Sequence, residues 1–351
     1  MPSAVFIVPG PLATLTGGSV YDRRMVDGLR QRGWSVDVRE LREGFPRPSR
    51  PALEDAADAF ASIDDGAIVV IDGLALGAMP DVLQPHARRL KVVALVHLPL
   101  AEEIGLEAHT ARSLEASERR ALQLAKRVVV TGYATVDAVV NLGVRASDVA
   151  VVEPGADASP LSRGSGSDTV SLLCVATISA GKGHEGLVRA LAANRSHAWA
   201  LTCVGSMSRD RTAVERLTRL IAAEGLHERV TLVGGASGAR LEACYDGADL
   251  FALYTARETY GMAVADALAH GLPVVSTRTG AIPTLVGDEA GLLVEPGDEP
   301  ALAEALSRVL SDAVLRERLR DGARHVRERL EDWDAAVGRM AAVLERVAAG
   351  G

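Results

Sequence analysis

Short, continuously apolar runs alternate with amphipathic stretches along the first half of the chain. A run that is apolar at every position is typical of a strand covered on both faces, whereas apolar residues recurring every three or four positions predict a helix. Strand and helix repeated in this order predict a parallel sheet wrapped by helices. The predicted strands of this half are Val5–Val8, Ser35–Arg39, Ala67–Ile71, Val92–Val96, Arg127–Val130 and Val149–Val152.

The alternation is interrupted at residues 154–168, where proline, glycine and serine dominate, as is typical of a linker. It then resumes with six more predicted strands and ends in helices. The sequence therefore predicts an α/β protein with two doubly wound domains, residues 1–157 and residues 168–330, followed by a terminal helix within residues 331–351. The second set of strands is Val170–Ala176, Ala200–Val204, Arg229–Val233, Leu250–Leu253, Pro273–Ser276 and Gly291–Val294.

Length and composition fit this prediction and exclude several classes of protein. A chain of 351 residues suits two domains of about 150 residues each. With 48% hydrophobic and 24% charged residues the chain is not disordered, and its net charge of −8 provides no basic lobe for nucleic acid. The sequence has no apolar stretch of the ~18 residues that a membrane helix needs, and no basic amphipathic helix that favours more than weak peripheral membrane contact.

Cysteine usage and the opening residues predict a cytoplasmic protein. Cys174 and Cys203 lie in predicted strands, and the three cysteines, which include Cys244, lack the spacing of a metal site. We therefore expect reduced thiols in a reducing compartment. Residues 1–10 have no basic leader ahead of their apolar run, so they predict a first strand and not a signal peptide.

The densest group of candidate functional residues follows the predicted strand Leu250–Leu253. A polar loop carries Glu258, a helix is predicted from about Tyr260 to Ala269, and Asp266 lies about two turns into that helix. Carboxylates at these positions suit the hydroxyls of a sugar or a ribose, and free amides at a helix start suit phosphate oxygens. Taken alone, such an acid pair is also typical of solvated helix ends. The candidate amides belong to Tyr260, Gly261 and Met262.

Three further motifs stand at the carboxyl ends of predicted strands, where doubly wound sheets bind ligands. Lys182 lies between two glycines that let the backbone approach a ligand, although such a sequence is also typical of a turn. Gly17 and Gly18 precede a helix expected near Ser19 and suit either a phosphate or a flexible loop. His97 ends a strand, and this position is equally consistent with a structural role and with binding of sugar hydroxyls.

These motifs resemble those of the retaining GT-B glycosyltransferases of glycosyltransferase family 4, the glycosyl transferases group 1. Glu258, the Tyr-Gly-Met that follows, Asp266 and the ALAHGLPVVST tail are similar to the family's Glu-x7-Glu region. Lys182 matches the lysine of its Gly-Arg-x4-Lys-Gly element, and the resemblance continues in order over residues 170–311. It implies the GT-B fold, with two Rossmann-like domains that face each other across a cleft and a terminal helix that packs back on the first domain.

The resemblance also implies residue roles on the donor side. Glu258 would contact the donor sugar, Asp266 the ribose and Lys182 the diphosphate, while Gly234 follows the strand at the base-binding loop. The sequence departs from the family pattern at two places: Asp266 stands where the family has glutamate, and Thr177 where it has arginine.

On the first domain the resemblance is confined to the architecture and two elements. Gly17 and Gly18 would face the donor phosphate, and His97 would lie near the donor sugar and the acceptor. We thus expect Lys182, Glu258 and His97 to be the catalytic residues.

The predicted function is that of a hexosyltransferase-type enzyme that moves a sugar from a nucleotide-diphosphate sugar to a small or lipid-linked hydroxyl acceptor. No cofactor and no metal are implied, because Asp64–Asp65 lacks the spacing of an Asp-x-Asp motif. A nucleotide-sugar 2-epimerase on the same scaffold and a non-catalytic nucleotide or glycan-binding module remain alternatives. A dinucleotide-dependent dehydrogenase is disfavoured because the Gly-x-Gly-x-x-Gly fingerprint is absent after the first strand.

Overall fold

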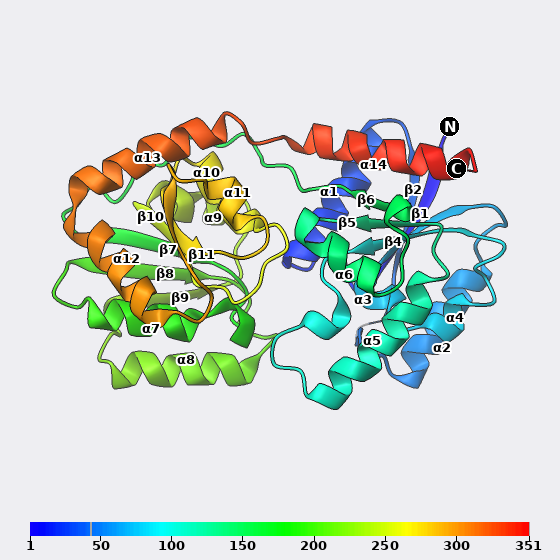
Figure 1. Ribbon diagram of the computed structural model, residues 1–351, viewed down its shortest axis with the longest axis horizontal. Helices are drawn as coiled ribbons and strands as arrows, with labels where there is room; N and C mark the ends of the chain where they lie inside the picture. The colour runs from blue at the N-terminus through cyan, green and yellow to red at the C-terminus, as the bar shows by residue number, and fades with distance from the viewer. Residues whose placement is uncertain (43, 351) are drawn as a thin grey trace. The chain divides into compact units, whose positions relative to one another are not determined.

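A computed structural model describes residues 1–42 and 44–350 and divides the chain into two compact units (Figure 1). The first unit comprises residues 1–155 and 332–351, and the second comprises residues 156–331. Each unit has its own parallel sheet of six strands with helices packed against it. The predicted doubly wound α/β architecture is therefore confirmed for both units.

The sheet of the first unit has the strand order β2-β1-β3-β4-β5-β6. Its central strands are buried at nearly every position, which explains their continuously apolar sequences. The strands are β1 (Ser3–Val8), β2 (Ser35–Glu40), β3 (Ile68–Asp72), β4 (Lys91–Val96), β5 (Arg127–Val130) and β6 (Val149–Val151). The helices are α1 (Gly17–Gln31), α2 (Arg50–Ala61), α3 (Gly73–Leu76), α4 (Pro80–Leu83), α5 (Ala108–Leu122), α6 (Val136–Asn141) and α14 (Trp333–Ala348).

The sheet of the second unit has the strand order β12-β11-β10-β7-β8-β9. The strands are β7 (Val170–Val175), β8 (Trp199–Val204), β9 (Val230–Gly234), β10 (Leu250–Leu253), β11 (Val274–Thr277) and β12 (Gly291–Val294). The helices are α7 (His184–Ala193), α8 (Arg211–Ala223), α9 (Ala239–Asp246), α10 (Met262–Ala269), α11 (Ile282–Val286), α12 (Glu299–Ser311) and α13 (Ala313–Arg327).

The strand order fixes where each sheet can bind a ligand. Consecutive strands run outward in one direction from β1 and in the other from β3, so the order reverses between these two neighbours. In the second unit the same reversal occurs between β7 and β10. The connections that leave two such strands depart to opposite faces of the sheet, and this opens a crevice at their carboxyl ends.

The terminal helix α14 belongs to the first unit, where it lies along α1 (Figure 1). The two helices approach closely at Gly28, because a Cβ built at that position would lie 2.4 Å from Cγ2 of Val337. The ring of Trp333 packs at 66° against that of Tyr21, and Nζ of Lys91 donates to the carbonyl oxygen of Ala348 at 2.7 Å.

The segment predicted as a linker is anchored to the second unit from Ala156 onward. The Ser162 hydroxyl lies within 2.9 Å of two carbonyl oxygens of that unit, those of Asp246 and Ala248. Nε of Arg163 donates to the Asp246 carboxylate at 2.8 Å. Composition indicated an irregular segment correctly, but these contacts make it a surface strap and not a free tether.

Candidate functional site

In the second unit, Lys182 and Glu258 form an ion pair between Nζ and Oε1. Lys182 follows β7 and Glu258 follows β10, so the pair spans the reversal of strand order in this sheet. The Glu258 side chain is 15% exposed and that of Lys182 is 31% exposed. Sequence reasoning singled out both residues, and the structure brings them together at the place where doubly wound sheets bind ligands.

The Lys182 loop is fastened to the Glu258 loop through its backbone. The carbonyl oxygen of Gly181 accepts hydrogen bonds from the Ala256 amide at 2.8 Å and from the Thr255 hydroxyl at 3.2 Å. A short 3₁₀ turn, Ala180–Lys182, then ends at Gly183, which adopts φ +65°. A Cβ at Gly183 would lie 1.7 Å from the carbonyl oxygen of Tyr254. From the sequence we expected Gly183 to allow the approach of a ligand, but in the structure its close neighbour is the chain itself.

Buried hydroxyls and a tight turn position the Glu258 loop. The hydroxyl of Thr255 lies 2.9 Å from the carbonyl oxygen of Arg257, and the hydroxyl of Thr277 donates to the Thr255 carbonyl oxygen at 2.6 Å. On the other side, a Cβ at Gly280 would lie 2.2 Å from the carbonyl oxygen of Glu258. The carboxylate of Glu258 therefore projects from a backbone that is held on both sides.

Helix α10 begins at Met262, two residues later than the sequence indicated. Gly261 precedes it at φ +98°, a left-handed conformation that cannot belong to the helix, and Tyr260 lies outside the helix with only 7% of its surface exposed. Among the residues that the structure describes, no side chain caps the start of α10. Its first amides have no partner within the helix, so they are suited to bind an anion.

The other predicted donor-side residues lie on neighbouring elements of the same unit. Asp266 is half-buried in α10, and its carbonyl oxygen lies 2.7 Å from Nδ1 of His270. Thr177 follows β7 and brings no charge where the related family has arginine. Gly234 is the last residue of β9, and a Cβ there would meet only Sδ of Met207, at 4.0 Å. The position that a side chain would take at Gly234 is therefore open.

A cavity of about 380 Å³ opens at the start of α7. Its lining includes Ser179, His184, Arg216 and Tyr254, but neither Lys182 nor Glu258. The His184 ring nitrogens and the Tyr254 hydroxyl are buried, and in the described ranges they have no hydrogen-bond partner. The lysine–glutamate pair therefore lies outside the wall of this cavity.

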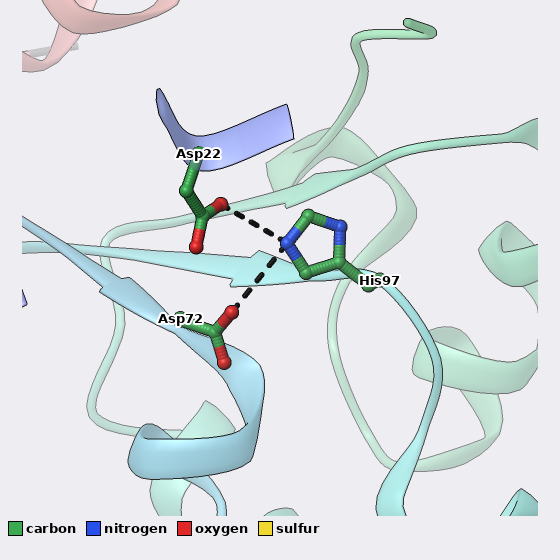
Figure 2. Close-up of side chains that lie close together, drawn as sticks. All are labelled: Asp22, Asp72 and His97. Carbon is green, nitrogen blue, oxygen red and sulfur yellow. Dashed lines mark hydrogen bonds and ion pairs between the residues drawn. The ribbon is translucent and has the colours of Figure 1, made fainter. Parts of the chain in front are cut away.

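In the first unit, His97 meets two buried aspartates, Asp22 and Asp72 (Figure 2). Nε2 of His97 lies 3.1 Å from Oδ1 of Asp22 and 3.5 Å from Oδ2 of Asp72. Asp22 comes from α1, Asp72 ends β3, and His97 follows β4, so the group gathers at the reversal of strand order in this sheet. Their ligand atoms all lie within 4.8 Å of one another, a spacing that also suits a metal ion.

Sequence reasoning found His97 but missed both aspartates, although each left a signal. Asp72 stands at the carboxyl end of a strand, as His97 nearly does, and its Oδ1 accepts from the Leu74 amide at 2.7 Å. Asp22 falls on the buried face of α1 together with Met25 and Val26. A charged residue inside the apolar stripe of a helix indicates a partner in the core.

Buried charge governs the protonation of this group. Burial alone would lower the pKa of His97, but the charges and hydrogen bonds of Asp22 and Asp72 raise that pKa to about 10. Burial also raises the pKa of Asp22 to about 7. The charge of His97 lowers this pKa, and the charge of Asp72 raises it further. The imidazole therefore carries its positive charge at neutral pH.

The glycine pair lies inside α1 and not ahead of it. Thr16 caps the helix, because its hydroxyl accepts from the Ser19 amide at 3.3 Å, and the helix therefore begins at Gly17. A Cβ at Gly18 would lie 3.3 Å from Cδ2 of His97, whereas a Cβ at Gly17 would meet nothing within 4 Å. The structure thus brings Gly18, but not Gly17, against the histidine.

Two doubly wound Rossmann-like units in one chain are the architecture of the GT-B fold. Solved structures support the fold: the chain aligns over 100% of its length and 100% of the other chain with sucrose-phosphate synthase from Thermosynechococcus elongatus, with a TM-score of 0.85 and 21% identity. Anabaena Alr3699/HepE, solved in complex with UDP and glucose, aligns over 97% of this chain and 99% of its own, with a TM-score of 0.75 and 18% identity.

The sequence comparisons find similar glycosyltransferases. Residues 169–312 match the model of the glycosyl transferases group 1. An MMP α-(1→4)-mannosyltransferase from Mycolicibacterium hassiacum is 26% identical over 90% of this chain and 80% of its own length. A D-inositol 3-phosphate glycosyltransferase from Salinispora tropica is 38% identical over 44% of this chain and 34% of its own. The resemblance inferred from the sequence motifs is therefore confirmed.

Within residues 1–42 and 44–350, none of the helices is both long enough and apolar enough to cross a membrane.

Proposed function

We propose that this glycosyltransferase moves a sugar from a nucleoside-diphosphate sugar to a hydroxyl acceptor, with retention of the anomeric configuration. The observation that carries the proposal is the contact between Lys182 and Glu258 at the strand reversal of the second unit. A primary ammonium group suits a diphosphate, and a carboxylate suits sugar hydroxyls. The diphosphate of such a donor therefore matches Lys182, and its sugar matches Glu258.

In this proposal the donor separates the charges that now neutralise each other. The diphosphate engages the Lys182 ammonium group and the amides at the start of α10, while Glu258 accepts hydrogen bonds from the sugar. Asp266 binds the ribose through its shorter side chain, and the base lies toward Gly234. We also propose that Gly17, Gly18 and His97 of the first unit contribute to binding of the donor.

The chemistry needs no protein nucleophile. The bond from the anomeric carbon to the diphosphate oxygen breaks, and the bond to the acceptor oxygen forms on the same face of the sugar. The departing phosphate oxygen takes the acceptor proton, and Lys182 and the helix amides stabilise the charge that develops there. We propose that no metal takes part, because Lys182 and these amides already supply positive charge.

The names of the relatives support a class of substrate. Two of them act as a mannosyltransferase and a D-inositol 3-phosphate glycosyltransferase, and a structural neighbour was solved with UDP and glucose. We propose a hexose as the transferred sugar and a small polyhydroxylated or lipid-linked molecule as the acceptor. UDP and GDP are accordingly the first nucleotides to test.

Thermal unfolding with UDP, GDP and ADP tests the donor site directly, because a ligand that binds only the folded state raises the melting temperature. We expect one diphosphate to stabilise the wild type and to have little effect on Lys182→Ala. No shift with any of the three would contradict the proposed site.

Labelled donor sugar then identifies the reaction. With acceptor, we expect a product of retained configuration by NMR and unchanged rates in EDTA. Without acceptor, we expect only slow donor hydrolysis. Accumulation of an epimerised sugar would replace the transferase proposal with an isomerase.

A further inference from the structure

In the Asp22–His97–Asp72 group of the first unit, two buried acids contact the same side of one imidazole ring. Two carboxylates share a single ring nitrogen, Nε2, at 3.1 and 3.5 Å. A proton on this nitrogen lets both carboxylates accept from it. In the described part of the chain, Nδ1 of His97 has no hydrogen-bond partner, and Figure 2 shows it on the side of the ring away from both acids.

Helix α1 supplies most of the ring's surroundings. Gly18, Tyr21 and Asp22 lie at positions i, i+3 and i+4, so they share one face of the helix. Gly18 leaves the imidazole room, the Tyr21 ring meets it edge-on at 5.2 Å, and Asp22 binds Nε2. One helical turn therefore fixes both the position and the rotation of the His97 ring.

The two carboxylates also determine the charge of the imidazole. Asp22 and Asp72 are 1% and 4% exposed, and a buried carboxylate is strongly disfavoured unless a cation or several hydrogen bonds compensate it. His97 is the cation that both acids contact. The Tyr21 ring also packs against the imidazole, and the Tyr21 hydroxyl donates to the carbonyl oxygen of Val152 at 2.8 Å.

We propose that Asp22 and Asp72 are positioning residues that hold His97 as an imidazolium, with Nε2 engaged and the Nδ1 proton directed outward as a fixed hydrogen-bond donor. The group of two carboxylates and one imidazolium has no excess positive charge. The Nδ1 proton therefore suits a neutral hydroxyl oxygen better than a phosphate. An imidazolium has no free lone pair, so His97 cannot act as a general base.

This inference deepens the proposed function, because it assigns the state of a residue expected near the sugar, but its main test needs no substrate. Histidine side chains labelled with ¹⁵N report the protonation of each ring nitrogen by NMR. His97→Gln identifies the His97 signals among those of the eight histidines. We expect both nitrogens of His97 to remain protonated in the wild type at pH 8.

Asparagine variants separate charge from shape. Asp22→Asn and Asp72→Asn keep the side-chain volume and one acceptor oxygen but remove the charge. We expect each to lower the His97 titration midpoint by at least one pH unit, a tenfold loss of proton affinity, and the double variant to lower it further. Asp81→Asn is the matched control, because Asp81 is an exposed aspartate of the same unit that pairs with Arg120.

Three results would overturn the proposal: a wild-type His97 that titrates below pH 7, asparagine variants that titrate as the wild type does, or stoichiometric Zn²⁺ uptake that His97→Gln abolishes. In the last case a metal would occupy Nε2 in place of its proton. Circular dichroism establishes beforehand that each variant is folded. If no nucleotide sugar supports transfer, the proposed function fails while the titration still decides this inference.

The rate profile provides a second readout that a merely structural role would not change. In the wild type, we expect the transfer rate to stay constant with pH until His97 loses its proton. In Asp22→Asn, the decline at high pH should begin at least one pH unit lower. A profile that keeps its shape while all rates fall equally would assign Asp22 to stability alone.

Discussion

The ammonium group of Lys182 contacts the carboxylate of Glu258 although 76 residues separate them in the chain. The two residues meet because β7 and β10 are neighbours in the sheet, and both side chains leave the carboxyl ends of these strands. In the first unit the same relationship between β1, β3 and β4 brings Asp22, Asp72 and His97 together. In each sheet the candidate charged residues therefore lie where the strand order reverses.

Removing either member of the lysine–glutamate pair should abolish most transfer without unfolding the protein. Because both side chains are partly exposed, we expect Lys182→Ala and Glu258→Gln to remain folded and to lose roughly 10²- to 10³-fold in kcat/KM. Lys126→Ala is the control, since this lysine is exposed and lies in the other unit. Near-normal turnover in both site variants would exclude the proposed donor site.

Gly183 should be far less replaceable than a glycine with the same backbone conformation. Gly183 and Gly225 both have φ +65°, but a Cβ at Gly183 would overlap the Tyr254 carbonyl oxygen, whereas nothing lies within 4 Å at Gly225. We expect Gly225→Ala to cost about 1 kcal/mol of unfolding free energy, and Gly183→Ala about 3 kcal/mol or more. Denaturant titration measures the unfolding free energy of both variants. Equal losses of stability would mean that the left-handed backbone conformation alone requires glycine at position 183.

Adjacent glycines in α1 provide a second comparison. In Gly18→Ala the new methyl group would press on the His97 ring, which Tyr21 and Asp22 prevent from moving aside. We expect this variant to shift the His97 NMR signals and to lower the melting temperature. Gly17→Ala should leave those signals in place and raise stability by up to ~1 kcal/mol, because alanine favours a helix. Identical spectra for the two variants would contradict the observed packing.

The stability of the protein should fall as pH rises from neutral to alkaline. The pKa of His97 is about 10 in the folded state and 6.5 when unperturbed, so the folded chain binds more protons between these values. The stabilisation is complete below pH 6.5 and is lost as pH rises toward 10, by at most about 1.4 kcal/mol per pH unit. Urea unfolding at pH 7, 8 and 9 measures this slope.

The double variant Asp22→Asn, Asp72→Asn is the reference for that measurement. Without the two charges the pKa of His97 should return toward or below its ordinary value, so the slope above pH 7 should largely disappear. Asp72→Asn keeps the oxygen that caps α3, which limits the structural change. A slope that persists unchanged would assign the alkaline loss of stability to other groups.

Local sequence was enough to place most strands, because continuously apolar runs are the mark of strands covered on both faces. Arg127–Val130, Leu250–Leu253 and Gly291–Val294 were predicted with the bounds that the structure shows. Helix starts were less accurate. The start of α1 depended on the hydroxyl of Thr16 and that of α10 on the left-handed conformation of Gly261, and neither follows from hydrophobic periodicity.

Sequence motifs likewise singled out Lys182, Glu258 and His97 as candidates, because their residue types and positions after strands indicate binding chemistry. They did not identify Asp22, because a helix position becomes buried only when the sheet beneath it is known. Nor did they show that Gly183 makes room for the Tyr254 carbonyl oxygen, a contact between segments far apart in the chain.

The sequence by itself thus determined the alternation of strands and helices, the two units and most of the candidate groups, since these depend on neighbours along the chain. Only the tertiary structure decided which strands lie side by side, and hence where each order reverses and which charges meet there. Apolar runs of similar composition can pair in several orders, and the choice among them is made by the packing of the whole sheet.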